Sequence, residues 1–208
     1  MTGRIRPGPY ALTDHSETGS DDMLTAVAAA LTGGVSLVQY RDKGTDHVRR
    51  TQEARRLAEL CREQGVPLII NDDVALAAEV GADGVHLGRD DAGVQAARDR
   101  LGEHSIIGVS CYNELARARA AVDQGADYVA FGSVFPSRTK PEAVHAPLEL
   151  LSEAREILPV PICAIGGITP ENARQVVAAG ADLIAVVRAV WEGDPQENAR
   201  ELAEAFDE

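Results

Sequence analysis

The sequence predicts a single α/β domain, residues 1–208, in which eight strand–helix units close into a (β/α)8 barrel, also called a TIM barrel. Short apolar runs alternate with longer alanine-rich segments, as expected for buried parallel strands covered by helices. The tripeptide Gly-Ala-Asp recurs at Gly81, Gly125 and Gly180, each time after a predicted helix and before an apolar strand. A doubly wound open sheet is the alternative, but no glycine-rich dinucleotide turn follows the first strand.

Composition narrows the class of protein. Apolar residues make up 45% of the 208 residues, and no linker-like stretch divides them. The formal net charge of −13 argues against nucleic acid and anionic membranes as partners, although a small phosphorylated substrate remains compatible with local basic groups. No apolar run approaches the ~20 residues of a membrane span, and no signal-peptide core is present. Three scattered cysteines favour free thiols in the cytoplasm, and assembly into a homo-oligomer is left open.

The first half of the chain is predicted to contain strands at 10–13, 35–40, 68–70 and 85–87. Between them we expect helices at 23–31, 46–64 and 74–80, followed by one at 92–101. The first helix is alanine-rich and stops at Gly33-Gly34, and the second stops at Gly65, because glycine readily ends a helix. Gly81 ends the third in the same way.

The second half continues the alternation. Strands are predicted at 105–109, 128–131, 162–165 and 183–187, and helices at 113–124, 148–158, 170–179 and 196–206. A polar, proline-bearing loop at 132–147 follows the sixth strand. A loop of this length in a compact barrel is more often functional than idle.

Two carboxylates are predicted to meet at the mouth of the barrel. Asp72 and Asp91 follow neighbouring parallel strands, whose carboxyl ends lie on the same edge of the sheet. Paired carboxylates favour a magnesium ion (Mg2+), which usually accompanies phosphate. Asp72 or Asp73 taken alone is equally well a helix N-cap. His86, at a strand end, is interpreted as a packed, hydrogen-bonded histidine.

Long hydrogen-bond donors follow the second strand. In the segment Gln39-Tyr40-Arg41-Asp42-Lys43, strand alternation places Gln39, Arg41 and Lys43 on one face. Three such donors are suited to binding an anion. A solvated strand end with scattered charge is the alternative interpretation of this segment.

Two further loops carry groups suited to phosphate. The long loop contains Ser137, Arg138, Thr139 and Lys140. After the seventh strand, Gly166 and Gly167 would let backbone N–H groups approach a phosphate, and Arg188 follows the eighth strand. A plain turn, with Thr169 as N-cap and Pro170 in the first helical position, explains the glycine segment equally well.

Six segments in order at the strand ends resemble the thiamine-phosphate synthase family: 39–43, 70–72, 84–91, 108–110, 137–140 and 165–168. The family joins a hydroxymethylpyrimidine diphosphate to a thiazole phosphate and releases diphosphate. The resemblance implies that Lys140, Ser110 and Arg41 are catalytic and that Asp72 and Asp91 hold magnesium. It assigns the pyrimidine diphosphate to Gln39, Tyr40, Arg41, Asp42, Lys43, Asn71, Ser110 and Lys140. It assigns the thiazole phosphate to Ser137, Arg138, Thr139, Gly166, Gly167, Val187 and Arg188.

The chain departs from the family pattern at two positions. Tyr112 stands where many relatives have a histidine, which in the sister thiazole tautomerases is thought to transfer the proton. Arg188 stands where many relatives have serine, so that a backbone contact to phosphate is retained but a hydroxyl contact is not. A tautomerase-like enzyme and a non-catalytic regulator that binds thiazole phosphate are the alternatives. Neither requires both aspartates, the donors after the second strand and Lys140 together.

Overall fold

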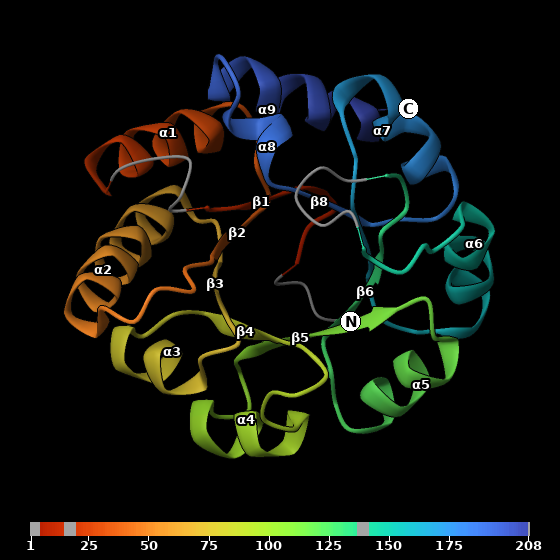
Figure 1. The fold of residues 1–208 in the computed structure, drawn as a ribbon, viewed down its shortest axis with the longest axis horizontal. Helices are drawn as coiled ribbons and strands as arrows, with labels where there is room; N and C mark the ends of the chain where they lie inside the picture. Colours follow the sequence, from red (N-terminus) through yellow and green to blue (C-terminus); the bar gives the residue numbers. More distant parts are fainter. Residues whose placement is uncertain (1–4, 15–19, 137–141, 208) are drawn as a thin grey trace.

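The computed structural model describes residues 5–14, 20–136 and 142–207. Its eight strands are parallel and pair in chain order, and β8 pairs with β1 to close the barrel. Helices surround the barrel on its outside (Figure 1), which confirms the predicted (β/α)8 fold. In the part of the chain that is described, no helix is long and apolar enough to cross a membrane. The strands are β1 (Gly8–Leu12), β2 (Leu37–Tyr40), β3 (Leu68–Asn71), β4 (Gly84–Leu87), β5 (Ile106–Tyr112), β6 (Tyr128–Gly132), β7 (Ile162–Ile165) and β8 (Leu183–Val186).

The helices begin and end close to the predicted bounds. They are α1 (Ser20–Thr32), α2 (His47–Gln64), α3 (Val74–Val80), α4 (Val94–Leu101), α5 (Leu115–Asp123), α6 (Leu148–Ile157), α7 (Pro170–Ala178), α8 (Arg188–Trp191), α9 (Pro195–Ala203) and the 3-10 turn η1 (Glu204–Phe206).

One observed helix was not predicted, and two predicted elements have different bounds or a different form. The short helix α8 was not expected, because four residues carry no readable helical period. Strand β5 continues three residues past the predicted end at 109, through polar Ser110, and stops at Tyr112, whose φ of 56° turns the chain. The last predicted helix, 196–206, is instead α9 followed by η1.

The barrel interior holds two tyrosines that shape the site above them. Tyr10 of β1 and Tyr128 of β6 are fully buried with Leu37, Ile69 and other residues of the inner layer. Glycine is required at 108, because a Cβ atom there would lie 2.0 Å from the Tyr128 ring. The inner layer therefore places a polar hydroxyl group under the mouth.

The recurring Gly-Ala-Asp segments form a repeated structure at the amino-terminal end of the barrel. Gly81 ends α3 with a φ of 65°, and Gly125 and Gly180 also have positive φ values just past α5 and α7. The carboxylates of Asp83, Asp127 and Asp182 accept hydrogen bonds from the backbone N–H groups of Leu68, Ile107 and Ile162, respectively. Each aspartate thereby ties its own strand to the strand before it.

Candidate active site

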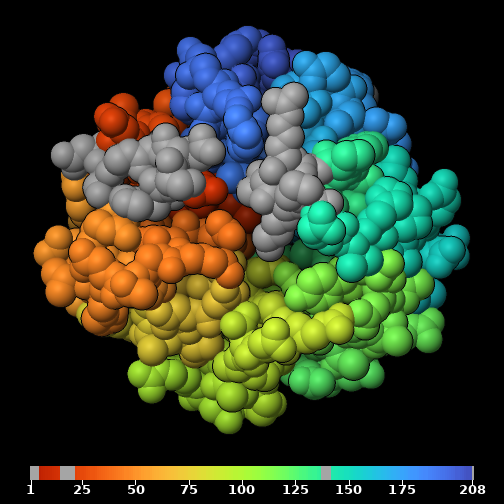
Figure 2. All heavy atoms as spheres, viewed as in Figure 1, coloured from red at the N-terminus to blue at the C-terminus, as the bar shows by residue number. Residues whose placement is uncertain are grey.

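The described residues predicted to bind ligands lie at or after the carboxyl-terminal ends of the strands, and several of their side chains meet at the mouth of the barrel. An open hollow of about 500 Å3 lies between the segments after β2 and β3 and is lined by Lys43, Asn71 and Asp72, among others. Figure 2 shows this face, with a recess near its centre between the orange segment after β2 and the yellow-green segment after β4. The hollow is where the donors after β2 meet the carboxylates after β3.

Asp72 and Asp91 lie side by side, as the strand order predicts. Asp72 has a φ of 62°, and its N–H donates to the carbonyl of His86 at 2.8 Å. The Asp91 carboxylate accepts a hydrogen bond from the N–H of Gly88 at 2.7 Å. Burial raises the pKa of Asp72, the adjacent Asp91 carboxylate raises it further, and Lys43 opposes both. The Lys43 ammonium is 3.7 Å from the Asp72 carboxylate.

The carboxylate pair has the chemistry that suits magnesium. Among the residues described, no group of three or more His, Cys, Asp or Glu side chains could hold a metal ion. Magnesium is nevertheless commonly held by one or two carboxylates, with substrate phosphate and water as the remaining ligands. A divalent cation between Asp72 and Asp91 would also relieve the crowding of like charge that raises the pKa of Asp72. The pair therefore fits a magnesium ion that shares its coordination with a phosphorylated substrate.

The neighbouring aspartates are placed differently. Asp73 caps α3 by accepting a hydrogen bond from the N–H of Leu76 at 2.9 Å, and it also pairs with Arg50. Asp90 is exposed to solvent. The N-cap interpretation is thus correct for Asp73, while Asp72 faces Asp91.

Side chains after β2 alternate between the mouth and helix α2. Lys43 lies near Asp72, and the Arg41 guanidinium is 4.0 Å from the Asp14 carboxylate. Tyr40 and Asp42 lie on the other face, where the Tyr40 hydroxyl donates to Glu53 of α2 at 2.7 Å. The Tyr40 and Asp42 side chains are therefore bonded to α2, although Asp42 is also among the residues that line the hollow, and contact of either residue with substrate stays a prediction.

A chain of hydrogen bonds crosses the barrel interior and links two predicted substrate-binding residues. The Gln39 amide donates to the Tyr10 hydroxyl at 2.7 Å, and the Tyr10 and Tyr128 hydroxyls are 2.9 Å apart. His86 continues the chain, with one ring nitrogen 2.9 Å from the Tyr128 hydroxyl and the other 2.8 Å from the Ser110 hydroxyl. Gln39 and Ser110 are consequently held by one buried network, and His86 is the packed, hydrogen-bonded histidine that the sequence predicts.

Sequence reasoning missed the two tyrosines of this network. Tyr10 and Tyr128 are separated by 118 positions, so no local pattern joins them. The available signal was that the two predicted strands at 10–13 and 128–131 each begin with a tyrosine, and a buried phenol hydroxyl needs a hydrogen-bond partner. Burial raises the pKa of both hydroxyls well above the usual range, and they therefore remain neutral donors and acceptors.

Arg117 of α5 was also missed, although it supports the end of β5. Its guanidinium donates to the carbonyl of Ser110 at 2.8 Å and to that of Gly88 at 3.1 Å. The ring of Tyr112 lies 4.9 Å from the guanidinium carbon of Arg89 and 5.9 Å from that of Arg117. Tyr112 thus packs against two cations.

The loops after β7 and β8 form the other side of the mouth. Gly167 has a φ of 64°, and a Cβ atom there would lie 2.6 Å from the carbonyl oxygen of Pro136. Gly166, with a φ of 107°, packs equally tightly against Ser133. Glycine is needed at both positions because the loop after β6 passes close to them. Four predicted residues of that loop lie outside the described residues: Ser137, Arg138, Thr139 and Lys140.

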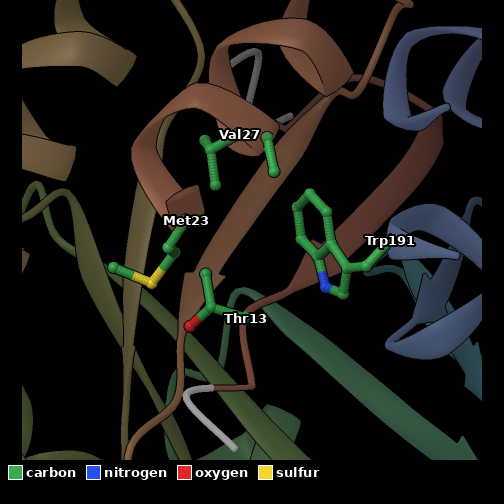
Figure 3. Close-up of a pocket in the computed structure, with 5 residues that line it drawn as sticks. Thr13, Met23, Val27 and Trp191 are labelled. Carbon is green, nitrogen blue, oxygen red and sulfur yellow. The ribbon is translucent and has the colours of Figure 1, made fainter. Parts of the chain in front are cut away.

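Helix α8 begins with Arg188, directly after Val187, and its end is anchored to the barrel. The Trp191 indole N–H donates to the Leu12 carbonyl at 2.8 Å. Figure 3 shows Trp191 beside α1, with Met23, Val27 and Thr13 nearby. The gap between these residues is too tight for a water molecule. The Arg188 guanidinium donates to the Glu192 carboxylate at 2.8 Å, so this side chain is engaged by its own helix.

These features define a (β/α)8-barrel enzyme whose mouth combines a carboxylate pair with groups suited to anionic ligands. Residues 9–190 match the family model described as thiamine monophosphate synthase. Thiamine-phosphate synthases from Nitrosococcus oceani and Thioalkalivibrio sulfidiphilus are 57% and 52% identical to this chain, over 90% and 99% of it and 86% and 98% of their own lengths. The structure of the thiamine phosphate pyrophosphorylase from Pyrococcus furiosus is 34% identical, with a TM-score of 0.87 over 97% of this chain and 96% of that one. The chain belongs to the thiamine monophosphate synthase family, and its function is thiamine-phosphate synthesis, a transferase reaction of thiamine biosynthesis.

Proposed function

We propose that the substrates are a hydroxymethylpyrimidine diphosphate and a thiazole phosphate, joined at this mouth to give thiamine phosphate and diphosphate. The observation that carries the proposal is that Asp72, which lines the open hollow together with Lys43, lies beside both Lys43 and the Asp91 carboxylate. Paired carboxylates beside a lysine suit a diphosphate that arrives with magnesium. A thiazole phosphate alone would need neither carboxylate.

We assign the diphosphate half of the site to Arg41, Lys43, Asn71, Ser110 and Lys140. Gln39 and Ser110 lie at the two ends of the buried network, and we assign both to the pyrimidine ring. The thiazole phosphate is assigned to Gly166, Gly167 and the Val187–Arg188 backbone, together with Ser137, Arg138 and Thr139 of the loop after β6. The described residues of the first half lie in or just after β2, β3 and β5, and those of the second half follow β7 and β8.

Magnesium, held by Asp72 and Asp91, would neutralise charge on the diphosphate and so make it a better leaving group. Arg41, Lys43 and Lys140 are proposed to act in the same direction, because their positive charges would stabilise the negative charge that develops on the diphosphate. The C–O bond to the pyrimidine methylene breaks, and its electron pair leaves with the diphosphate. The electron-rich aminopyrimidine supports the resulting cation.

The thiazole nitrogen then supplies the electron pair of the new C–N bond. Holding the thiazole by its phosphate places this nitrogen next to the cation, which removes most of the entropy cost of their meeting. The bond-forming step transfers no proton. His86, held between Tyr128 and Ser110, is therefore not required as a general base.

We further propose that residues 1–208 act as one domain in the cytoplasm. All three cysteines are free and buried, which suits a reducing compartment. Assembly into a homo-oligomer is a separate hypothesis, which light scattering of the purified protein would test.

The decisive experiment incubates the purified protein with both substrates, with and without magnesium. We expect thiamine phosphate and diphosphate in equal amounts, only when both substrates and magnesium are present. Product formed equally well after chelation of divalent ions would contradict the metal assignment. A thiazole altered without the pyrimidine would indicate tautomerase activity instead, and binding without turnover would indicate a regulator.

A further inference from the structure

We infer that Arg49 and Glu53 of α2 are positioning residues for the diphosphate half of the site. The inference rests on the proposed function, in which Arg41 and Lys43 bind the pyrimidine diphosphate. Neither Arg49 nor Glu53 reaches the mouth. They act through a group of four side chains, Tyr40, Asp42, Arg49 and Glu53, called the β2–α2 clamp below.

The clamp is built around a buried carboxylate. Glu53 is only 3% exposed, although its side chain ends in a carboxyl group. The Tyr40 hydroxyl donates to one of its oxygens at 2.7 Å, and Arg49 donates to both, at 3.0 and 2.9 Å. Burial raises the pKa of the Tyr40 hydroxyl, and the Glu53 carboxylate raises it further, which keeps this group a donor. A charged group removed from water in this way requires such partners.

Arg49 carries the connection from the helix to the loop. Its second terminal nitrogen donates to the Asp42 carboxylate at 2.5 Å, while the other Asp42 oxygen accepts from the N–H of Gly44 at 2.7 Å. The Asp42 side chain is only 4% exposed. The loop after β2 is thereby fastened to α2 at Asp42, and the bond between Gly44 and Asp42 closes the turn that contains Lys43.

Because side chains alternate along an extended chain, this fastening also sets the direction of the side chains that face the mouth. Tyr40 and Asp42 are drawn toward α2, so the residues between and after them, Arg41 and Lys43, are turned the opposite way. The Arg41 backbone N–H is also fixed, since it donates to the Thr13 hydroxyl at 2.9 Å. The clamp thus holds the backbone between the two cations from the α2 side.

A purely structural ion pair predicts a different result from a positioning device. Loss of a structural pair lowers the melting temperature and leaves both substrates equally well bound. Loss of the clamp would displace Arg41 and Lys43, which serve one substrate only. The two Michaelis constants, measured separately, therefore distinguish the two roles.

The test compares Glu53→Gln and Arg49→Lys with a matched control, Arg98→Lys. Arg98 also forms a shielded ion pair, 2.8 Å from Asp127, but at the amino-terminal end of the barrel. We expect both clamp variants to raise the KM for the pyrimidine diphosphate by roughly tenfold or more, with the KM for the thiazole phosphate changed less than about twofold. Calorimetric titration with inorganic diphosphate and magnesium should show the same loss without turnover. Arg98→Lys should lower the melting temperature and leave both constants within about twofold.

The outcomes separate this inference from the proposed function. If Arg41→Ala and Lys43→Ala raise the KM for the pyrimidine diphosphate but the clamp variants do not, the clamp has no positioning role. If Arg41→Ala and Lys43→Ala leave that constant unchanged, the assignment of the diphosphate half fails, and the inference fails with it. Equal increases in both constants in the clamp variants would show a general loss of structure and would also overturn it. Should Glu53→Gln not fold, Arg49→Lys, which retains the charge, decides the question.

Discussion

Asp72 occupies a backbone conformation that most residues avoid. Its φ of 62° lies in the left-handed region, where aspartate and asparagine are among the few non-glycine residues that are tolerated. This turn ends β3 and brings the Asp72 carboxylate beside Asp91 instead of onto helix α3. Asparagine keeps both the shape and the tolerance, so Asp72→Asn removes the charge with little change to the backbone.

We predict that Asp72→Asn and Asp91→Asn lower kcat/KM by about 10²-fold or more, because each removes a ligand of the ion that neutralises the leaving group. Stability should stay unchanged or rise slightly, since one of two crowded charges is lost. Magnesium with diphosphate should raise the melting temperature of the wild type, and this shift should shrink in both variants. Steady-state kinetics and thermal unfolding measure the two effects.

Asp73→Asn and Asp90→Asn are the controls for this prediction. Asparagine still caps α3 at 73, and Asp90 is exposed, so turnover should remain within a few-fold of wild type. If asparagine lowered turnover equally at all four positions, the choice of metal ligands among the residues at the strand ends would be wrong by one position. Full activity of all four variants would move the magnesium site elsewhere.

Arg117 gives a second prediction at the residue scale. Its guanidinium bridges the carbonyls of Gly88 and Ser110 with two charged donors held in one plane. Arg117→Ala should reduce the free energy of unfolding by about 1–3 kcal/mol, the range for lost hydrogen bonds from a charged donor. Urea unfolding checks this value. The matched change Arg119→Ala, at an exposed position of the same helix, should cost less than about 0.5 kcal/mol.

At the scale of elements, the Gly-Ala-Asp segments show how a short sequence repeat stabilises a barrel. A parallel strand begins with backbone N–H groups that need acceptors, and the aspartate before the next strand supplies one. Asp127 accepts from Ile107 at 2.8 Å, and Asp182 accepts from Ile162 at 2.9 Å. Asp127 also forms an ion pair with Arg98, whose side chain is 12% exposed, and Asp182 forms one with Arg155, whose side chain is 56% exposed.

We therefore predict that Asp127→Ala destabilises the protein more than Asp182→Ala. Both leave a strand N–H without its acceptor, at a cost of about 1–3 kcal/mol. Asp127→Ala also leaves the shielded Arg98 without its carboxylate partner, which adds to the cost. Asp182→Ala breaks only the exposed pair with Arg155, and exposed ion pairs contribute little to stability. Denaturant unfolding should give this order, and kcat should stay near wild type in both, since the mouth lies at the other end of the barrel. The reverse order would mean that exposure of the arginine does not govern the cost.

The sequence predicts helices and strands well where the pattern of apolar residues is long enough to read. It predicts them poorly where the conformation of a single residue sets the end of an element. The eight strands were located because each is a buried apolar run between alanine-rich segments. The end of β5 was missed because Ser110 is polar and because the turn depends on the conformation of Tyr112. Helix α8 is fixed by tertiary contacts such as that of Trp191 with Leu12, which no local pattern contains.

The site follows the same division. Asp72 and Asp91 were paired correctly because parallel strands bring their carboxyl ends to one edge. The alternation of Gln39, Arg41 and Lys43 also follows from the strand. The Tyr10–Tyr128–His86 network and the β2–α2 clamp join residues from different strands and helices, so they required the folded chain.

At the scale of the whole molecule, closure of the barrel couples the two ends of the chain. Strand β8 pairs with β1 from Gly8–Leu183 to Ala11–Val186, and the Trp191 indole N–H donates to the Leu12 carbonyl. Helix α9 also packs against α1 near the closure (Figure 1). Since no unit of the barrel has an edge of its own, opening any one strand removes partners from two neighbours. This arrangement predicts cooperative unfolding.

The three cysteines lie in different elements, so the reactivity of their thiols can be used to follow unfolding at three places in the barrel. Cys61 lies on α2, Cys111 near the end of β5 and Cys163 on β7, and all are buried. Burial raises the pKa of Cys61 and of Cys111 to about 12 and also raises that of Cys163. A group with a pKa of about 12 is ionised to only about one part in a thousand at pH 9. The reactive thiolate is therefore almost absent in the folded state, even in mild alkali.

We predict that a chromogenic aromatic disulfide reagent modifies none of the thiols of the folded protein at pH 8 within minutes, and all three in denaturant. If the chain unfolds as one domain, each thiol becomes reactive at the same urea concentration, which should coincide with the loss of helical circular dichroism. Variants that keep one cysteine each, with alanine at the other two positions, assign the transition to its element. Reaction of Cys61 at lower urea than Cys163 would show that α2 detaches before the barrel opens, and the proposal of a single cooperative domain would then fail.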